Sequence, residues 1–508
     1  MAVDTKRIAK NTIYMYIRMI IIMGVSFYTS RVVLDKLGVD DFGLFNAVGG
    51  VVGMLSFLNN TLAKGTSRFL TFELGNNNAD RLKATFSTAF YSHLMLMVLL
   101  LIVLETAGVW FLNNKLVIPD GRMFAAQWVY QISLLTMCLG VLQVPFTSCV
   151  IAHEDMSLYA YLSIFEAVGK LAIVYVLSIS AFDKLILYSA LIFLMQLLVF
   201  FIYIGFNKHK YSESKLQRIF DQQIFKNMLG FSGWNIIANL SETLKMQGSI
   251  ILINMFFRPA LVAAMAISNQ VTTILMNFIY QFTTALEPQI IKTYAAGDYK
   301  SSQKLNLDST ILVFDLVLVI FLPLIFVIEP ILDLWLVEVP EKTVQFIQVA
   351  LATQIAGVFN VTLYTPMVAS GKLKTNSLWG LYLGVGQFAV VYFIYKSGGD
   401  VMCLPYSMFT VAMVFSLLVK PYIAYKEIGY DIKNIVLCFY SCFKVLILSV
   451  LLTWLADWFL VPKELYQYLT LLIISVLIIM SCSFIFMEKS VRIKLINIVK
   501  ERLRVSKS

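Results

Sequence analysis

The sequence predicts an all-α polytopic membrane protein, and its composition and the spacing of its polar breaks carry that prediction. Of the 508 residues, 59% are hydrophobic and 14% are charged, and the mean hydropathy is +0.78. A soluble domain is about half apolar and about a quarter charged. No polar break exceeds roughly 20 residues, which is too short for a catalytic domain of about 50 residues or more. The activity of this chain is therefore expected inside a bilayer.

The apolar segments are long enough for about fourteen transmembrane helices, because a helix needs roughly 20 apolar residues to cross the hydrocarbon core. In chain order the segments of that length lie at 12–34, 42–63, 84–112, 123–150, 158–180, 185–206, 227–256, 260–286, 306–328, 343–369, 377–396, 402–425, 437–459 and 467–487. The first is expected to be a retained span, since it contains Arg18 and Arg31 and has no small-residue cleavage site of the kind that ends a signal peptide.

The seventh and eighth segments are the least apolar. Glu242 and Lys245 interrupt the seventh. The eighth carries a polar stripe made of Asn269, Gln270, Asn277 and Gln281. Polar and ionisable residues within spans face a bundle interior or a water-filled cavity. We expect these two segments to line a cavity.

The distribution of Lys and Arg predicts that both termini lie in the cytoplasm, because cytoplasmic loops carry the excess of these residues. With the N-terminus inside, the inside breaks and the tail hold most of the cations, among them Lys64, Arg68, Arg81, Lys83, Lys208, Lys210, Lys215, Arg218, Lys292, Lys300, Lys304, Lys489, Arg492 and Arg502. The outside breaks hold mostly single cations, and one is acidic, with Glu329, Asp333, Glu338 and Glu341. One inside break disagrees, since it holds His153, Glu154 and Asp155 without Lys or Arg.

A weak internal repeat predicts two lobes of six spans. A shift of 222 residues places Met54 on Met276, Thr61 on Thr283, Ala63 on Ala285, Gly75 on Gly297, and Ser87-Thr88 on Ser309-Thr310. The shift covers six spans, an even number, so the two copies share one orientation, as parallel repeats do. Chance similarity between apolar sequences is the alternative. The predicted division is an N-lobe at 1–206, a basic cytoplasmic linker at 207–226, a C-lobe at 227–435, and two further spans with a basic tail at 436–508.

Ionisable residues within spans are the candidate functional residues, because each costs several kcal/mol unless it is paired or wetted. They are Arg18, Arg31, Glu166, Lys170, Glu242, Lys245, Asp308, Asp315 and Lys444. Two lobes around a midplane site are the architecture of alternating-access transport. We therefore interpret Arg18, Arg31, Lys170 and Lys245, with Asn269 and Gln270, as candidate substrate contacts.

The acidic residues Glu166, Glu242, Asp308 and Asp315 are candidates for coupling to an ion. Glu166 and Lys170 are four apart and Glu242 and Lys245 three apart, so each pair meets on one helix face. A self-neutralised pair that lowers the cost of insertion is the alternative, and for Arg18 and Arg31 the alternative is that each reaches the nearer interface. Lys444 lies outside both predicted lobes.

Other functional classes are disfavoured. The net charge of +10 comes from cations in short breaks and not from one basic face, which argues against nucleic acid. The six cysteines lie in or beside apolar runs without a CxxC spacing; Cys438 and Cys442 are four apart, but only three histidines exist in the chain, so no metal site and no cofactor are expected. A membrane enzyme such as a polysaccharide polymerase or ligase lacks a long loop or a carboxylate cluster here, and GxxxxGK[ST] is absent.

The first hundred residues resemble a known family. The stretch YTSRVVLDKLGVDDFGLF at 28–45 and the stretch GTSRFLTFELGNNN at 65–78 resemble the polysaccharide flippases of the multidrug/oligosaccharidyl-lipid/polysaccharide exporter superfamily. The resemblance implies a V-shaped pair of six-helix lobes. It also implies transfer of an undecaprenyl-diphosphate-linked oligosaccharide from the cytoplasmic to the periplasmic leaflet of a bacterial inner membrane, for surface polysaccharide biosynthesis.

The resemblance also bears on the site. Relatives that flip the peptidoglycan lipid precursor have arginines in early spans of the N-lobe, a part that Arg18 and Arg31 can play. Drug antiporters of this fold commonly have an acidic residue in the first span, and this chain has none there before Asp35. The leading hypothesis is a non-enzymatic flippase with lipid-linked oligosaccharide and membrane lipids as partners; the alternative is a cation-coupled drug or small-molecule antiporter. A polysaccharide polymerase is a candidate partner at the acidic break near Asp333.

Overall fold

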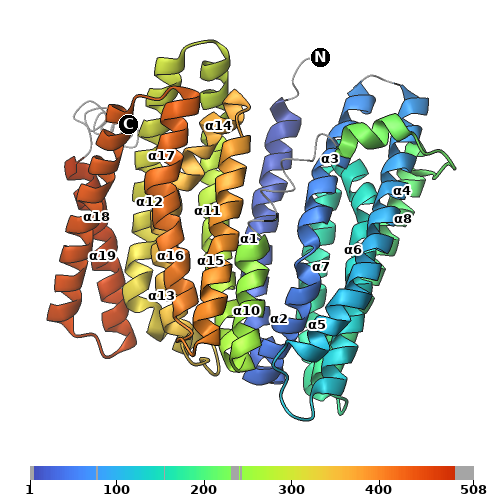
Figure 1. The fold of residues 1–508 in the computed structure, drawn as a ribbon, viewed down its shortest axis with the longest axis horizontal. Helices are drawn as coiled ribbons and strands as arrows, with labels where there is room; N and C mark the ends of the chain where they lie inside the picture. Colours follow the sequence, from blue (N-terminus) through green and yellow to red (C-terminus); the bar gives the residue numbers. More distant parts are fainter. Residues whose placement is uncertain (1–4, 76–77, 154, 230–239, 241–242, 487–508) are drawn as a thin grey trace, which may run out of the picture. The chain divides into compact units, whose positions relative to one another are not determined.

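The computed structural model describes the backbone of residues 5–75, 78–153, 155–229, 240 and 243–486, and these residues form helices and connecting turns without a strand (Figure 1). In the first half the helices are α1 (Thr5–Leu37), α2 (Val39–Gly53), α3 (Ser56–Gly75), α4 (Ala79–Val103), η1 (Leu104–Gly108), α5 (Val109–Asn114), α6 (Met123–Ala152), α7 (Met156–Ile179), α8 (Lys184–Lys210) and η2 (Ser212–Ser214).

The second half continues with η3 (Leu244–Gly248), α10 (Ser249–Phe256), α11 (Pro259–Ala295), α12 (Tyr299–Trp335), α13 (Thr343–Thr362), α14 (Tyr364–Ser370), α15 (Lys374–Lys396), α16 (Cys403–Val414), η4 (Phe415–Val419), α17 (Lys420–Ile423), η5 (Ala424–Ile428), α18 (Ile432–Leu460) and α19 (Leu465–Phe486). Here η1, η3, η4 and η5 are π-helical and η2 is a 3₁₀ turn.

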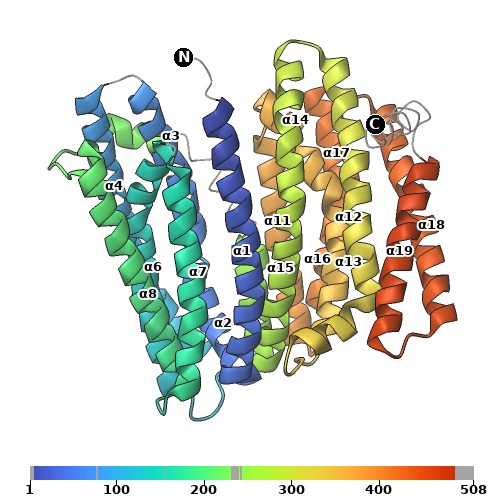
Figure 2. The same ribbon diagram turned by 180° about the vertical axis from the view of Figure 1, so that it is seen from behind.

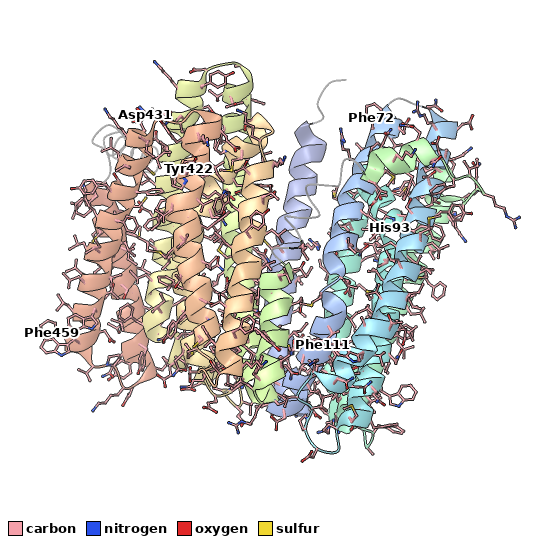
Figure 3. All side chains as sticks on the ribbon, in the orientation of Figure 1. Phe72, His93, Phe111, Tyr422, Asp431 and Phe459 are labelled. Carbon is pink, nitrogen blue, oxygen red and sulfur yellow. The ribbon has the colours of Figure 1, made fainter. Side chains whose placement is uncertain are left out.

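The prediction of an all-α multi-pass membrane protein is confirmed. Among the described residues, 11 helices are long and apolar enough to cross a membrane. They coincide with the third to sixth and the eighth to fourteenth predicted segments. Large apolar side chains also point outward, as expected for lipid contact: Phe72 on α3 is 63% exposed and Phe459 on α18 is 75% exposed (Figure 3).

The remaining three predicted segments are not among these 11 helices. The first lies on α1, and the described end of the seventh lies on η3 and α10. The second, predicted as one span over 42–63, is interrupted by a turn at Met54 and Leu55 between α2 and α3. Gly49, Gly50 and Gly53 precede this turn, and glycine is the weakest helix former after proline.

The chain forms two compact units. The first consists of Met1–Ile267, Trp335–Thr343 and Gly380–Leu404. The second consists of Ser268–Leu334, Val344–Trp379 and Pro405–Ser508. The lobe boundaries predicted at residues 206, 227 and 436 stay a prediction.

Helix α6 is the centre of the first unit. It packs against α2, α3, α4 and α8, and α1 packs along α7 (Figures 1 and 2). The core between α2 and α6 includes the fully buried Leu44, Val48, Val129 and Tyr130. Tyr130 is polar at its tip, and its hydroxyl donates a 2.7 Å hydrogen bond to the Leu104 carbonyl in η1. A buried hydroxyl needs such a partner, because leaving it unpaired costs about 1–3 kcal/mol.

Arg122 joins three helix ends of the first unit. Its guanidinium donates to both carboxylate oxygens of Asp41 at the start of α2, with a 2.9 Å bond from Nε, and also to Asp183 ahead of α8. Asp183 in turn caps α8 by accepting from the backbone N–H groups of Leu185 and Ile186. Burial alone would raise the pKa of the Asp183 carboxyl, but the bond from Arg122 and the two N–H groups hold that pKa below its usual value. One cation thus bridges two carboxylates.

We expect Arg122→Gln to lower the stability of the protein by about 2–3 kcal/mol, because it leaves two partly buried carboxylates without their cation. Arg258→Gln is the matched control. Arg258 pairs with Glu341 at 3.1 Å, but the two side chains are 76% and 59% exposed, so its loss is expected to cost less than about 1 kcal/mol. Thermal unfolding of the purified variants in detergent measures the difference. Equal melting temperatures for the two variants would contradict the three-helix role of Arg122.

In the second unit, α18 packs against α19 and is tied to α12. The Cys438 thiol on α18 lies 3.6 Å from the Leu307 carbonyl on α12. The ring of Phe359 on α13 lies 4.2 Å from that of Phe439, centroid to centroid. All six cysteines are free thiols, and five of them, including Cys438 and Cys442, are buried, in line with their positions in or beside apolar runs of the sequence.

Candidate functional site

A row of polar side chains follows one face of α7 in the first unit. Tyr159, Ser163, Glu166 and Lys170 are spaced by four, three and four residues. Side chains at this spacing lie above one another on one face of a helix. Helix α1 packs along α7 and faces this row with its own cation, Arg18.

Arg18 of α1 contacts the N-terminal end of the row, at Tyr159. The centre of its guanidinium lies 4.6 Å from the centroid of the Tyr159 ring, and Nη2 lies 3.4 Å from the tyrosine hydroxyl. A cation over an aromatic face is attracted by the ring quadrupole. The Nε of Arg18 is buried and has no hydrogen-bond partner among the described residues. The guanidinium therefore keeps a donor available within the first unit.

Tyr203 of α8 closes the same region from a third helix. It is 3% exposed, and its hydroxyl lies within electrostatic range of Tyr159, Glu166 and Arg18. Farther along α8, Gln196 donates a 2.9 Å hydrogen bond to Gln143 of α6. Helices α1, α6, α7 and α8 thus bring aromatic hydroxyls, amides and charges together in the first unit.

Glu166 and Lys170 form the predicted pair on one helix face. The distance from Lys170 Nζ to Glu166 Oε1 is 2.6 Å. The Lys170 side chain is 43% exposed and the Glu166 side chain 32% exposed, so both charges remain accessible from outside the packed core. An ammonium has three donors, and the carboxylate uses one of them. Lys170 can therefore hold Glu166 and a second anion at once.

A second contact between α1 and α7 is made by two tyrosines on another face of α7, and Arg31 lies apart from Arg18. The hydroxyls of Tyr28 on α1 and Tyr175 on α7 are 2.8 Å apart. Arg31 is a half-buried residue of α1. It follows Arg18 by 31 − 18 = 13 positions, which at about 100° per residue places the two side chains roughly 140° apart around the helix. The two arginines do not share one face of α1.

The other candidate substrate contacts lie on two different units. Lys245 is half-buried in the π-helix η3, which belongs to the first unit. Asn269 and Gln270 are half-buried on α11, in the second unit. Short π-helical turns are frequent at functional sites. Lys245, Asn269 and Gln270 keep the role of candidates.

The acidic residues predicted to couple transport to an ion do not all lie on one helix. Glu242 lies outside the described residues. Asp308 and Asp315 are two turns apart on α12; Asp308 is exposed and Asp315 half-buried. Asp315 lies near Ser483 of α19 and Cys442 of α18. One oxygen of its carboxylate is buried without a hydrogen-bond partner among the described residues. Asp315 therefore faces the two C-terminal helices.

Sequence reasoning missed a buried cation in the second unit. Lys420 at the start of α17 is 1% exposed. Its ammonium lies 5.0 Å from the ring centroid of Tyr364 and 3.8 Å from the sulfur of Met367. Glu287 of α11 is within electrostatic range of the Tyr364 hydroxyl. The signal was available, since Lys420 is a single charge inside the apolar segment predicted at 402–425, but it was not included among the ionisable residues within spans.

Comparison with known proteins identifies the fold. No protein-family model matches the chain, and no curated protein matches it. Among solved structures, the lipid II flippase MurJ in an inward closed conformation is 12% identical, with a TM-score of 0.67 over 94% of this chain and 98% of that one. An inward-facing multidrug resistance MATE family transporter of the MOP superfamily is 13% identical, with a TM-score of 0.62 over 81% of this chain and 97% of the other.

A third solved structure, the MATE multidrug transporter DinF-BH, is 13% identical, with a TM-score of 0.61 over 84% of this chain and 96% of that one. The protein is thus a multi-pass helical membrane protein. More particularly, it has the fold that the lipid II flippase MurJ and the MATE transporters share.

Proposed function

We propose that this protein is a flippase that moves an undecaprenyl-diphosphate-linked oligosaccharide from the cytoplasmic to the periplasmic leaflet of a bacterial inner membrane. The observation that carries the proposal is the polar row of the first unit, where Arg18 packs on Tyr159 and Lys170 pairs with Glu166, so that two cations lie along one face of α7. Guanidinium and ammonium groups are the usual partners of phosphate oxygens.

The extent of the structural likeness supports a lipid-linked cargo over a drug. The lipid II flippase matches 94% of this chain, whereas the two MATE transporters match 81% and 84%. The first span is also free of Asp and Glu up to Asp35. A cationic drug needs an acidic partner, while a diphosphate needs the cations that this chain has.

The direction of transport has a physical driving force. Moving an anion outward across an inside-negative membrane gains about 2.3 kcal/mol per charge per 100 mV. In the proposed cycle the diphosphate binds to the cations from the cytoplasmic side, and alternating access then exposes it on the periplasmic side. Both termini are cytoplasmic in this proposal. A coupled ion would add to the driving force of the membrane potential. Its candidate carriers are Glu166, Glu242, Asp308 and Asp315.

The proposal is tested by leaflet-resolved transport of a radiolabelled undecaprenyl-diphosphate oligosaccharide in proteoliposomes that contain the purified full-length chain. We expect transfer of the labelled lipid between leaflets that depends on the protein. Its rate is expected to rise when a potassium gradient and valinomycin set a membrane potential that drives anions outward. Empty liposomes and an equal amount of a soluble protein are the controls. Absence of transfer for several such cargoes, together with uptake of lipophilic cations, would replace the proposal with a drug or small-molecule antiporter.

The acidic end of α12 gives the proposed flippase a docking candidate. Glu329 and Asp333 lie there and are both exposed. In the proposed orientation they lie on the periplasmic side, where a polysaccharide polymerase takes up the flipped units. A basic surface on that polymerase would be the complementary partner.

A further inference from the structure

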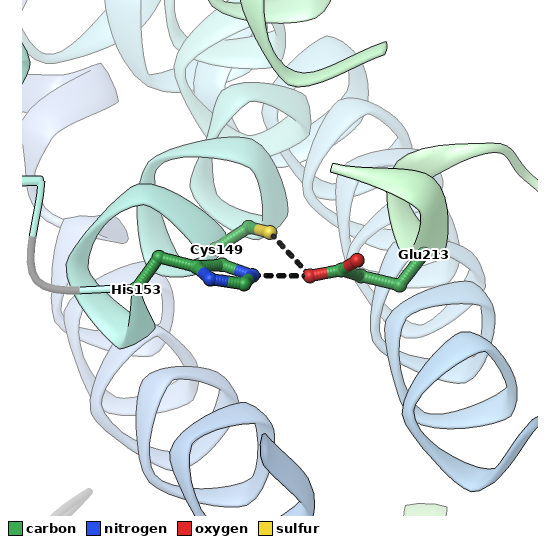
Figure 4. Close-up of side chains that lie close together, drawn as sticks. All are labelled: Cys149, His153 and Glu213. Carbon is green, nitrogen blue, oxygen red and sulfur yellow. Dashed lines mark hydrogen bonds and ion pairs between the residues drawn. The ribbon is translucent and has the colours of Figure 1, made fainter. Parts of the chain in front are cut away.

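Three side chains of types that commonly bind metals lie together at the C-terminal end of α6 (Figure 4). Cys149 lies in the last turn of α6, and His153 is the residue that caps this helix, with its backbone N–H donating a 3.0 Å hydrogen bond to the Cys149 carbonyl. Glu213 comes from the 3₁₀ turn η2, which follows α8. The Cys149 sulfur is 3.6 Å from Glu213 Oε1, His153 Nε2 is hydrogen-bonded to the same oxygen, and the three ligand atoms all lie within 4.8 Å of one another.

The cluster is enclosed and held in place. Cys149 is 1% exposed and Glu213 4% exposed, while the His153 side chain is 26% exposed. The ring of Tyr211 stacks on His153, with centroids 4.1 Å apart and planes at 10°. The Tyr211 hydroxyl donates to Asp155, which also pairs with Lys210 at 2.6 Å. The imidazole is therefore fixed with Nε2 directed at the carboxylate.

We propose that Cys149, His153 and Glu213 form a binding site for one divalent zinc-like cation. Thiolate, imidazole and carboxylate together are a zinc donor set, and Zn²⁺ takes them at about 2.0–2.3 Å. Two donors on a tetrahedral zinc are then roughly 3.3–3.8 Å apart, a range that contains the observed sulfur-to-oxygen distance. The metal takes the place of the protons on the thiol and between His153 and Glu213. A water completes the tetrahedron.

The site would fix the chain segment that leaves the first helical bundle. Beyond η2 this segment is already bound to α4, where the backbone N–H groups of Gln217 and Asp221 donate to Ser87 and Thr88, each at 3.0 Å. A cation at Glu213 adds a second attachment, to the end of α6. This inference concerns binding by the chain itself and does not depend on the proposed cargo.

The expectation that the chain has no metal site came from Cys438 and Cys442, which belong to the second unit and are not members of this cluster. The alternative is a metal-free clamp, in which the hydrogen bonds of Glu213 to His153 and Cys149 hold the turn. The two differ in what a serine at position 149 does. A hydroxyl preserves a hydrogen bond to Glu213, but it is a poor zinc ligand compared with a thiolate.

The test uses the purified full-length chain, stripped with a chelator and then exposed to Zn²⁺ or Co²⁺. We expect one metal ion per chain and a thiolate-to-cobalt charge-transfer absorption. Cys149→Ser is expected to remove that absorption, and both Cys149→Ser and His153→Ala to weaken Zn²⁺ binding at least tenfold. Cys138→Ser on the same helix and His209→Ala on α8 are matched controls that retain the metal.

A second readout follows the attached segment. Zn²⁺ is expected to slow tryptic cleavage after Lys210 and Lys215 in the unmodified chain and in the two control variants, but not in Cys149→Ser. If the stripped chain takes up no metal, or if Cys149→Ser and His153→Ala bind it as the unmodified chain does, the zinc site is refuted and the cluster is a hydrogen-bonded clamp. Because neither readout involves transport, failure of the flippase proposal leaves this test unaffected.

Discussion

Replacement of Gly43 by alanine is expected to prevent the first unit from assembling. Gly43 lies on α2 against the start of α11, and a Cβ atom there would be 1.9 Å from the Pro259 carbonyl oxygen and 2.6 Å from its carbon. Both contacts are with backbone, so no side-chain rotation relieves them. Overpacking of a core costs typically about 1–3 kcal/mol and more where the backbone has to move. We expect a loss above about 3 kcal/mol, measured as yield of monodisperse protein and as its melting temperature.

Gly49→Ala on the same helix is the control. A Cβ at Gly49 meets no atom within 4 Å, and alanine is a better helix former than glycine by about 1 kcal/mol. This variant is expected to be at least as stable as the unmodified chain. If Gly43→Ala matched it in yield and melting temperature, α2 and Pro259 could not be as close as described.

The fold was largely accessible from sequence because a bilayer imposes a simple rule. A span needs a long apolar run with every backbone group paired internally, and the helices of this chain follow those runs closely. The rule fails where an apolar run contains residues that are weak helix formers. The segment at 42–63 is long enough for one helix, yet its glycines let the chain turn at Met54 and Leu55, and hydropathy carries no record of that.

The candidate site was only partly accessible. The pairing of Glu166 with Lys170 is local, so helix periodicity predicted it correctly. The contact of Arg18 with Tyr159 joins residues 141 positions apart, and the approach of Tyr203 requires a third helix. Such contacts depend on which helix faces which, a property that the period of one helix does not contain. The spacing of the residues in the polar row, from Tyr159 to Lys170, nevertheless predicts that they share one face of a helix.

The same limit applies to the cluster at the end of α6. Cys149 and His153 have a spacing that is visible in sequence, but Glu213 is 60 residues beyond His153 in a short turn. Counting histidines and cysteines by proximity along the chain cannot find a third ligand of this kind. Three-dimensional placement was required.

Neutralising both members of the Glu166–Lys170 pair is expected to abolish most flipping without harming insertion. Lys170→Met alone removes the cation that faces the Glu166 carboxylate, so a loss of folded protein is expected together with any loss of transport. The double variant Glu166→Gln/Lys170→Met has no charge left to bury, and its insertion should be normal. If Lys170 contacts the diphosphate, the double variant still loses a charge-assisted hydrogen bond worth about 1.5–3 kcal/mol. That loss corresponds to a transport rate lower by roughly 10- to 100-fold.

The double variant separates the two explanations of the pair, because self-neutralisation and cargo binding predict opposite results for it. A pair that serves only to lower the cost of insertion becomes dispensable once both charges are gone, and transport then equals that of the unmodified chain, which would contradict a cargo role for Lys170. Lys444→Met is the control for removing a membrane cation. Lys444 lies on α18 of the second unit, 3.9 Å from the Tyr440 ring centroid, and is not part of the polar row, so its loss should change the rate by less than about twofold. A normal rate for Lys444→Met beside a collapsed rate for the double variant would assign the effect to the position of the charge and not to its presence in the membrane.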